Sequence, residues 1–142
     1  WLVDLGGQIS VGGAGPTGGW PVAIAHPRYR DRAYRQVRLL EGSLSTSGGS
    51  ERDVNAGDVR IRHIFDPRPG RPAAFDGSVT VWHRRGLASD ALSTALFVMG
   101  PEEGLRWAES RGIAALYLVP GPGDAVRATA TRTFTERFTG PE

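Results

Sequence analysis

The chain has 142 residues, no cysteine, and 17 basic against 15 acidic residues, which gives a formal net charge of +2 at pH 7. This length suits one domain with an ordinary core, and no apolar run reaches the roughly 20 residues that cross a bilayer. The lack of cysteine excludes disulfides, thiolate zinc sites and a cysteine nucleophile. All basic residues are arginine, which excludes lysine Schiff-base chemistry and a P-loop lysine. Because acids nearly balance bases, no nucleic-acid partner is expected.

The first 83 positions hold short segments that alternate between apolar and polar residues, which predicts strands separated by glycine and proline turns. The predicted strands are 1–5, 8–11, 20–25, 36–40, 59–64 and 78–83. Small, polar, glycine-rich stretches at 12–19 and 42–49 predict loops. Positions 66–70 contain two prolines and a glycine, which predicts a rigid turn. The chain opens at Trp1 in an apolar run without a leader pattern, so we expect it to be a piece of something longer.

Helical spacing of apolar residues appears only in the second half of the sequence. It predicts a helix over 89–99, with Ser89 or Asp90 as the N-terminal cap and Gly100 as the stop. A second helix is predicted over 102–111.

The last part of the sequence predicts a hairpin. A buried strand is expected over 113–119, a turn over 121–124 and a returning strand over 126–134. The overall order is strands, two consecutive helices, then strands. This order predicts an α+β fold in which an antiparallel sheet carries the two helices on one face.

Asp90 and Thr94 are the most suggestive pair for a metal. On a helix, residues four positions apart project from one face about one turn apart. A carboxylate and a hydroxyl are ligands that Mg²⁺ accepts, with waters or phosphate oxygens completing its shell. The alternative is that Asp90 caps the helix and Thr94 packs, and the spacing alone favours this second interpretation.

His63 ends a predicted strand just before the rigid turn that begins at Asp66. A histidine held there can act as an acid, a base or a hydrogen-bond donor, although a structural role is the commoner outcome for such a residue. Five arginines lie around this turn and could neutralise a pyrophosphate, with solvated surface charge as the alternative. They are Arg52, Arg60, Arg62, Arg68 and Arg71.

Two glycine-containing turns, at 4–7 and 47–50, could offer backbone amides to phosphate oxygens. Neither matches a dinucleotide-binding or Walker motif, and a pair of glycines is usually only a turn. Taken alone, these turns have little specificity.

The order and spacing of four motifs resemble the C-terminal half of ApbE, the FAD:protein FMN transferase family. The motifs are DLGGQI at 4–9, SG at 47–48 with Arg52 after it, HIFDPR at 63–68 with Gly70, and SDALSTA at 89–95 running on to 102. The resemblance covers nearly the whole chain, since the tail over 113–138 is similar to the closing strands of that family.

The resemblance implies an enzyme that binds FAD with Mg²⁺. It would transfer FMN to a threonine hydroxyl of a target flavoprotein and release AMP. Some members of the family instead hydrolyse FAD to FMN and AMP. One Mg²⁺ bridging the two phosphates can neutralise charge and orient the pyrophosphate for in-line attack.

The resemblance also assigns roles to residues. Asp90 and Thr94 become metal ligands, which reverses the preference drawn from spacing alone. The cofactor-binding residues would be His63, Ile64, Phe65, Asp66, Gly6, Gly7, Ser47 and Gly48. His63 would lie near the pyrophosphate or flavin and is the candidate base that takes the threonine proton.

Two departures from the family pattern stand out. Pro69 occupies the position before Gly70 where the family usually has a threonine, so a hydroxyl is missing. The N-terminal half of the family is also missing, so residues 1–142 are expected to be the C-terminal portion of a two-part enzyme. We expect this portion alone to bind FAD weakly and to transfer FMN poorly.

The resemblance implies a location at the extracytoplasmic face of a bacterial membrane or in the periplasm, with any lipid tether on the missing half. An apolar face that this half would cover could let two copies form a homodimer. The sequence leaves two alternatives to a transferase. One is an FAD-binding module or FAD pyrophosphatase without transferase activity, and the other is an unrelated α+β domain.

Overall fold

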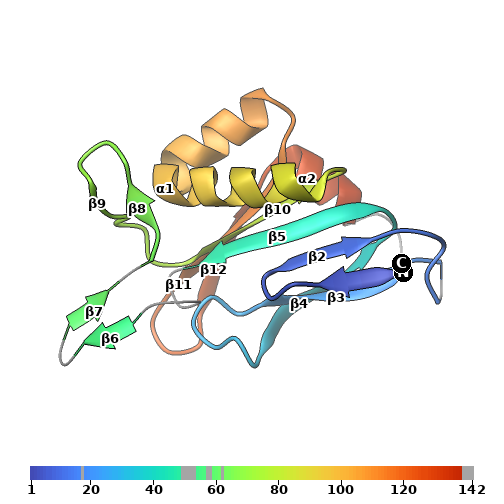
Figure 1. Ribbon diagram of the computed structural model, residues 1–142, viewed down its shortest axis with the longest axis horizontal. Helices are drawn as coiled ribbons and strands as arrows, with labels where there is room; N and C mark the ends of the chain where they lie inside the picture. Colours follow the sequence, from blue (N-terminus) through green and yellow to red (C-terminus); the bar gives the residue numbers. More distant parts are fainter. Residues whose placement is uncertain (17, 49–53, 57–58, 62, 139–142) are drawn as a thin grey trace.

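The computed structural model describes residues 1–16, 18–48, 54–56, 59–61 and 63–138. A six-stranded antiparallel sheet forms its centre, with the strands in the order β1-β2-β5-β10-β11-β12. These strands are β1 (Leu2–Asp4), β2 (Gln8–Val11), β5 (Gly42–Gly48), β10 (Ser78–His83), β11 (Ala114–Pro120) and β12 (Val126–Ala130). Figure 1 shows the long helix α1 (Gly86–Ser110) lying on one side of this sheet.

Three hairpins and a short helix complete the described structure. The hairpins are β3 (Trp20–Ala25) with β4 (Ala33–Leu39), β6 (Val54–Ala56) with β7 (Val59–Ile61), and β8 (Phe65–Asp66) with β9 (Arg71–Pro72). The short helix is α2 (Arg132–Phe138). Within the described residues, no helix has both the length and the apolar character needed to cross a membrane.

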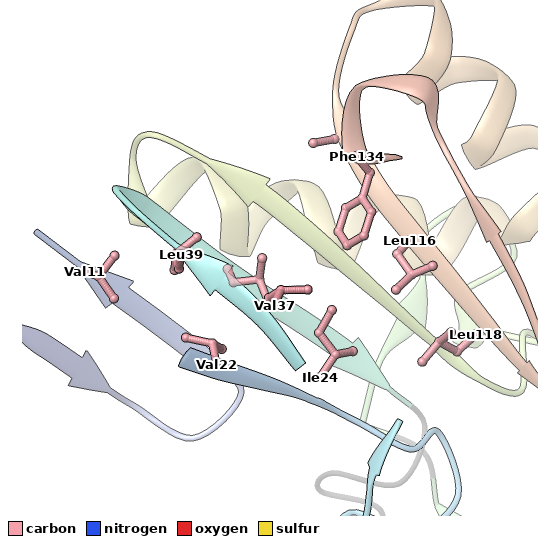
Figure 2. Close-up of a cluster of buried hydrophobic side chains, with 10 residues drawn as sticks. Val11, Val22, Ile24, Val37, Leu39, Leu116, Leu118 and Phe134 are labelled. Atoms are coloured by element: carbon pink, nitrogen blue, oxygen red, sulfur yellow. The ribbon is translucent and has the colours of Figure 1, made fainter. Parts of the chain in front are cut away.

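The two faces of the sheet bury separate apolar clusters, because successive side chains of a strand point to opposite faces. On β11, Leu116 and Leu118 belong to the cluster that the β3–β4 hairpin and α2 cover, whereas Ala115 and Tyr117 belong to the cluster under α1. Figure 2 shows the first cluster, with Val11, Val22, Ile24, Val37, Leu39, Leu116, Leu118 and Phe134 labelled. The sheet is therefore the middle layer of the fold.

Helix α1 has two parts that meet at a kink. Gly100 has φ 75° and ψ 174°, which is outside the helical region, and Pro101 follows it. Leu96 from the first part and Ala108 from the second pack into the same cluster on the same face of the sheet. The predicted α+β fold, with an antiparallel sheet and two consecutive helices on one face, is confirmed.

The loop predicted over 42–49 is wrong, because 42–48 is the central strand β5. It pairs with β2 on one side and with β10 on the other. Its sequence, GSLSTSG, contains a single large apolar residue, Leu44, so it lacks the apolar alternation that marks most strands. The burial of β5 depends instead on hydroxyl partners from other elements, which a local pattern does not reveal.

Several predicted boundaries also move. The first part of α1 begins at Gly86, and Arg85 stands at the N-cap without a side-chain hydrogen bond, so the cap predicted at Ser89 or Asp90 is wrong. The strand predicted over 36–40 begins at Ala33, and the one predicted over 59–64 ends at Ile61.

The returning strand predicted over 126–134 ends at Ala130, and helix α2 follows. Thr131 explains the change, because its Oγ1 accepts a hydrogen bond from the backbone N–H of Phe134 at 3.3 Å. This is the geometry of a threonine N-cap, which satisfies an amide that the first turn of a helix leaves unpaired. The strand pair expected at the end of the chain is therefore followed by a helix.

Candidate functional site

A cavity of about 430 Å³ lies where the β1–β2 turn, β5, the first part of α1 and the segment before β8 meet. Its volume falls in the range of small-molecule sites, about 300–1,000 Å³. Residues predicted for the site from the sequence line it together: Gly6, Gly7, Ser47, His63, Ile64, Phe65, Asp90 and Thr94. Three lining residues, Leu5, Gln8 and Thr46, were not predicted. They flank predicted positions, so proximity in sequence was the one signal available for them.

The β1–β2 turn contributes backbone to the cavity. Gly6 and Gly7 have φ of 72° and 94°, values that residues with a side chain rarely adopt. The Asp4 carboxylate accepts a hydrogen bond from the Gly6 N–H at 2.9 Å. The Gly7 carbonyl accepts one from the Thr46 N–H at 2.8 Å, which ties the turn to β5.

Helix α1 contributes Asp90 and Thr94, both exposed and one turn apart on the side that faces β5. The Ser45 hydroxyl donates a hydrogen bond to Asp90 Oδ1 at 3.3 Å. The Ser47 and Thr94 hydroxyls lie 3.2 Å apart. Two buried hydroxyls of the central strand therefore contact the two predicted metal ligands.

The segment 63–65 forms another wall. Ile64 is buried in the cluster under α1, and its carbonyl accepts a hydrogen bond from the Ala73 N–H at 2.9 Å, which anchors the segment. His63 and Phe65 on either side of it are exposed, and the Phe65 side chain is 52% exposed. The anchored Ile64 thus holds an imidazole and an aromatic ring at the rim.

Two residues predicted for cofactor binding do not line the cavity. Gly48 is buried in β5 opposite Ser78. Asp66 accepts hydrogen bonds from the backbone N–H, Nε and Nη2 of Arg68, at 2.9, 2.9 and 2.8 Å. These hydrogen bonds hold the pKa of the Asp66 carboxyl below its ordinary value and raise the pKa of Arg68. Asp66 therefore closes the 66–70 turn and leaves no free carboxylate for the cavity.

The arginines predicted around this turn have separate placements. Arg68 pairs with Asp66 and lies 3.6 Å from a Glu103 carboxylate oxygen. Arg71 is exposed in β9. Positions 52 and 62 lie outside the described residues, as does the side chain of Arg60.

The donor set suits a hard cation but completes only part of its shell. Within the described residues no group of three or more histidine, aspartate or glutamate side chains could hold a metal. Asp90 and Thr94 offer one carboxylate and one hydroxyl oxygen beside the same cavity. Mg²⁺ is commonly held by one or two carboxylates, with waters and substrate phosphates as its other ligands. The residues present therefore fit Mg²⁺ together with a phosphate-bearing ligand.

Sequence and structure comparisons identify the class to which this fold and cavity belong. The model of the ApbE family matches residues 1–117. The chain belongs to the ApbE family.

Individual relatives agree with this assignment. The chain is 34% identical to the FAD:protein FMN transferase of Rhodobacter capsulatus, over 98% of this chain and 27% of that protein. It is 35% identical to the FAD:protein FMN transferase of Treponema pallidum, over 96% of this chain and 43% of that protein.

Solved structures of ApbE proteins also match this chain over nearly its whole length. The apo form of the flavinyl transferase ApbE from Pseudomonas stutzeri superposes with a TM-score of 0.75 and 37% identity, over 99% of this chain and 44% of that one. The ApbE protein from Thermotoga maritima gives a TM-score of 0.82 and 28% identity, over 97% and 44%. The chain thus spans less than half the length of the relatives it matches.

Proposed function

We propose that this chain carries the metal-binding part of an FAD:protein FMN transferase. In the proposed reaction, FMN passes from FAD to a threonine hydroxyl of a target flavoprotein, and AMP is released. The observation that carries the proposal is one cavity in which Asp90 and Thr94 meet the glycine turn and the 63–65 segment. Family membership supports the same activity, because the relatives are named for it.

The reaction balances as a phosphoryl-group transfer. The threonine oxygen attacks the FMN phosphorus of FAD, the bond from that phosphorus to the bridging oxygen breaks, and AMP leaves with that oxygen. The threonine proton passes to a base. Mg²⁺, when bound, would neutralise pyrophosphate charge and so ease departure of AMP.

The residues of this chain divide the work. Asp90 and Thr94 supply oxygen ligands, and the Gly6–Gly7 turn lets the ligand approach backbone that carries no side chain. Phe65, half exposed, offers an aromatic face to a ring of FAD, and the buried Ile64 lines the same cavity. We assign His63 as the base, because it lies on the same cavity wall.

The test is an FAD titration followed by flavin fluorescence, on the protein in its full natural length, with Mg²⁺ and then with EDTA. Removing an interaction to a charged group costs about 1.5–3 kcal/mol, so Asp90→Ala should weaken Mg²⁺-dependent binding about tenfold or more. Asp124→Ala is the matched control, because Asp124 is an exposed carboxylate that pairs with Arg32 and does not line the cavity. Binding indifferent to EDTA, or equal losses in the two variants, would contradict the metal assignment.

Product analysis separates transfer from hydrolysis. With FAD and a candidate acceptor flavoprotein, the transferase should release one AMP for each flavin that stays attached to the acceptor in a denaturing gel. Free FMN and AMP in equal amounts, with or without acceptor, would instead identify an FAD pyrophosphatase. Binding without any AMP would identify a binding module.

A further inference from the structure

A row of serine hydroxyls lies between the central strand and helix α1. Ser43, Ser45 and Ser47 alternate along β5 on the side that faces α1, and each is at least nine-tenths buried. We call these three residues the serine row. Across the sheet, Ser45 pairs with Val81 and Ser47 pairs with Val79. The valines pack into the apolar cluster under α1. The face of the sheet under α1 is therefore apolar on β10 and lined by hydroxyls on the neighbouring strand β5.

The single hydrogen that each hydroxyl carries lets the direction of these hydrogen bonds be inferred. The fully buried Ser93 of α1 donates its hydrogen to the backbone carbonyl of Asp90 at 2.9 Å, and its Oγ lies 3.4 Å from Ser45 Oγ. A serine hydroxyl has one hydrogen, so Ser93 must accept in its 2.9 Å contact with Ser47. Ser47 thereby uses its own hydrogen, and in its 3.2 Å contact with Thr94 it must accept.

This direction determines what Thr94 presents to the cavity. Its hydrogen points to Ser47, so its lone pairs remain for a ligand in the cavity. Ser45 acts on Asp90 in a similar way, because its hydroxyl donates to Oδ1 at 3.3 Å and so favours one orientation of the carboxylate. Both side chains therefore offer acceptors to the cavity, which is the arrangement that a cation needs.

We propose that Ser45 and Ser47 are positioning residues for a divalent cation held by Asp90 and Thr94. Ser45 orients the carboxylate, and Ser47 takes the Thr94 hydrogen away from the cavity. This inference rests on the proposed function, since it concerns the same cation. It also gives a reason why β5 buries serine hydroxyls at positions where its neighbour β10 buries valines.

The serine row contains its own control. Ser43 is as buried as Ser45, on the same strand and the same face, but its hydroxyl bonds the Ile9 carbonyl and Ser10. Removing the hydroxyl of Ser43 should therefore reproduce the folding consequences of the same change at Ser45 without touching Asp90 or Thr94.

The experiment compares Ser45→Ala, Ser47→Ala and Ser43→Ala in the protein at its full natural length. It measures the Mg²⁺ concentration that gives half-maximal FAD binding, and the melting temperature without metal. Loss of a group that orients a metal ligand typically costs 10- to 100-fold in metal affinity. We expect about a tenfold rise in the Mg²⁺ midpoint for the first two variants and less than a twofold rise for Ser43→Ala, with similar falls in melting temperature.

Equal midpoints in all three variants would overturn the inference, while a large effect of Asp90→Ala in the same assay would leave the proposed function standing. If wild-type binding ignored Mg²⁺, both proposals would fall together. Should an alanine variant not fold, Ser45→Cys fills nearly the same space with a weaker donor. It should raise the midpoint in the same direction, and an unchanged midpoint there would also overturn the inference.

Discussion

The two ends of the contact between α1 and the sheet are built from different chemistry. Against β10 and β11, the helix buries Leu96 and Phe97 on Val79, Val81 and neighbouring apolar side chains. Against β5, it buries Ser93 on the serine row. Burying a CH₂ group contributes about 0.8 kcal/mol, whereas a typical buried hydrogen bond contributes about 0.5–1.5 kcal/mol net and is costly when unpaired.

The difference separates stability from ligand orientation. The apolar end stabilises the packing of helix on sheet, and it tolerates replacement of one apolar side chain by another of similar volume. Hydrogen bonds are directional, so the hydroxyl end fixes where Asp90 and Thr94 point. Four predictions sharpen this comparison, in order of their expected effect on folding.

Phe97→Ala should have the largest effect, because Phe97 is 1% exposed and packs 5.1 Å, centroid to centroid, from Phe75. Truncating a buried phenylalanine costs about 3–5 kcal/mol. Denaturant unfolding measures the loss. Leu87→Ala on the same helix is the control, because Leu87 is 77% exposed and should change stability by less than about 0.5 kcal/mol. If the two variants lost similar free energy of unfolding, the apolar end would not be the main source of stability in this contact.

Tyr117→Phe should have an intermediate effect. The buried Tyr117 hydroxyl donates to the Leu96 carbonyl at 2.7 Å, and burial raises the pKa of this phenol well above its ordinary value. The variant leaves a buried carbonyl without that donor, which costs about 1–3 kcal/mol. The comparison is Tyr34→Phe, which removes the hydroxyl of a tyrosine at the surface. If both variants unfolded at the same denaturant concentration, the hydrogen bond from Tyr117 to the Leu96 carbonyl would make no net contribution to stability.

Ser93→Ala should have a somewhat smaller effect on folding, about 1–2 kcal/mol, because its hydrogen bonds to the Asp90 carbonyl and to Ser47 are lost while alanine favours the helix slightly. Ser110 is the matched position, because it also donates to the carbonyl three residues earlier but is exposed. We therefore expect Ser110→Ala to be near neutral. Ser93→Ala should also raise the Mg²⁺ midpoint for FAD binding, because Ser47 loses its acceptor, and no such rise is expected for Ser110→Ala.

The smallest effect is the pH dependence of the turn beside the cavity. Arg68 lowers the pKa of Asp66 below its ordinary value of 3.8. The folded pKa is thus below the unfolded one, so the contact contributes fully above about pH 4 and is lost as the pH falls through the folded value. Carboxyl NMR titration should show the Asp66 pKa rising towards its ordinary value in Arg68→Ala. In Arg71→Ala it should stay low, and a pKa insensitive to Arg68 would contradict the assignment.

The sequence predicted an element correctly where its periodicity, or a residue that tolerates positive φ, allowed few local structures. The two parts of α1 were predicted from helical spacing and from Gly100, whose positive φ ends the first part. Strand β10 followed from its alternation, and the turn at Gly6 and Gly7 from residues that tolerate positive φ. Strand β5 was missed because hydroxyl side chains resemble a loop unless their partners are known.

The sequence by itself determined the family, because four motifs occur in order along the chain, and these motifs contain most of the residues that line the candidate site. It determined the α+β class through the order of the predicted strands and helices. Only the tertiary structure decided which of those residues meet. It brought Asp90 and Thr94 beside Ser47 and the 63–65 segment, and it directed Asp66 to Arg68 and Gly48 into the sheet. The reason is physical: a hydroxyl or carboxylate binds whichever partner folding places within about 3 Å. For Asp90 and Thr94 those partners are Ser45 and Ser47, 45 and 47 residues away in the chain, whereas Asp66 finds Arg68 only two residues away.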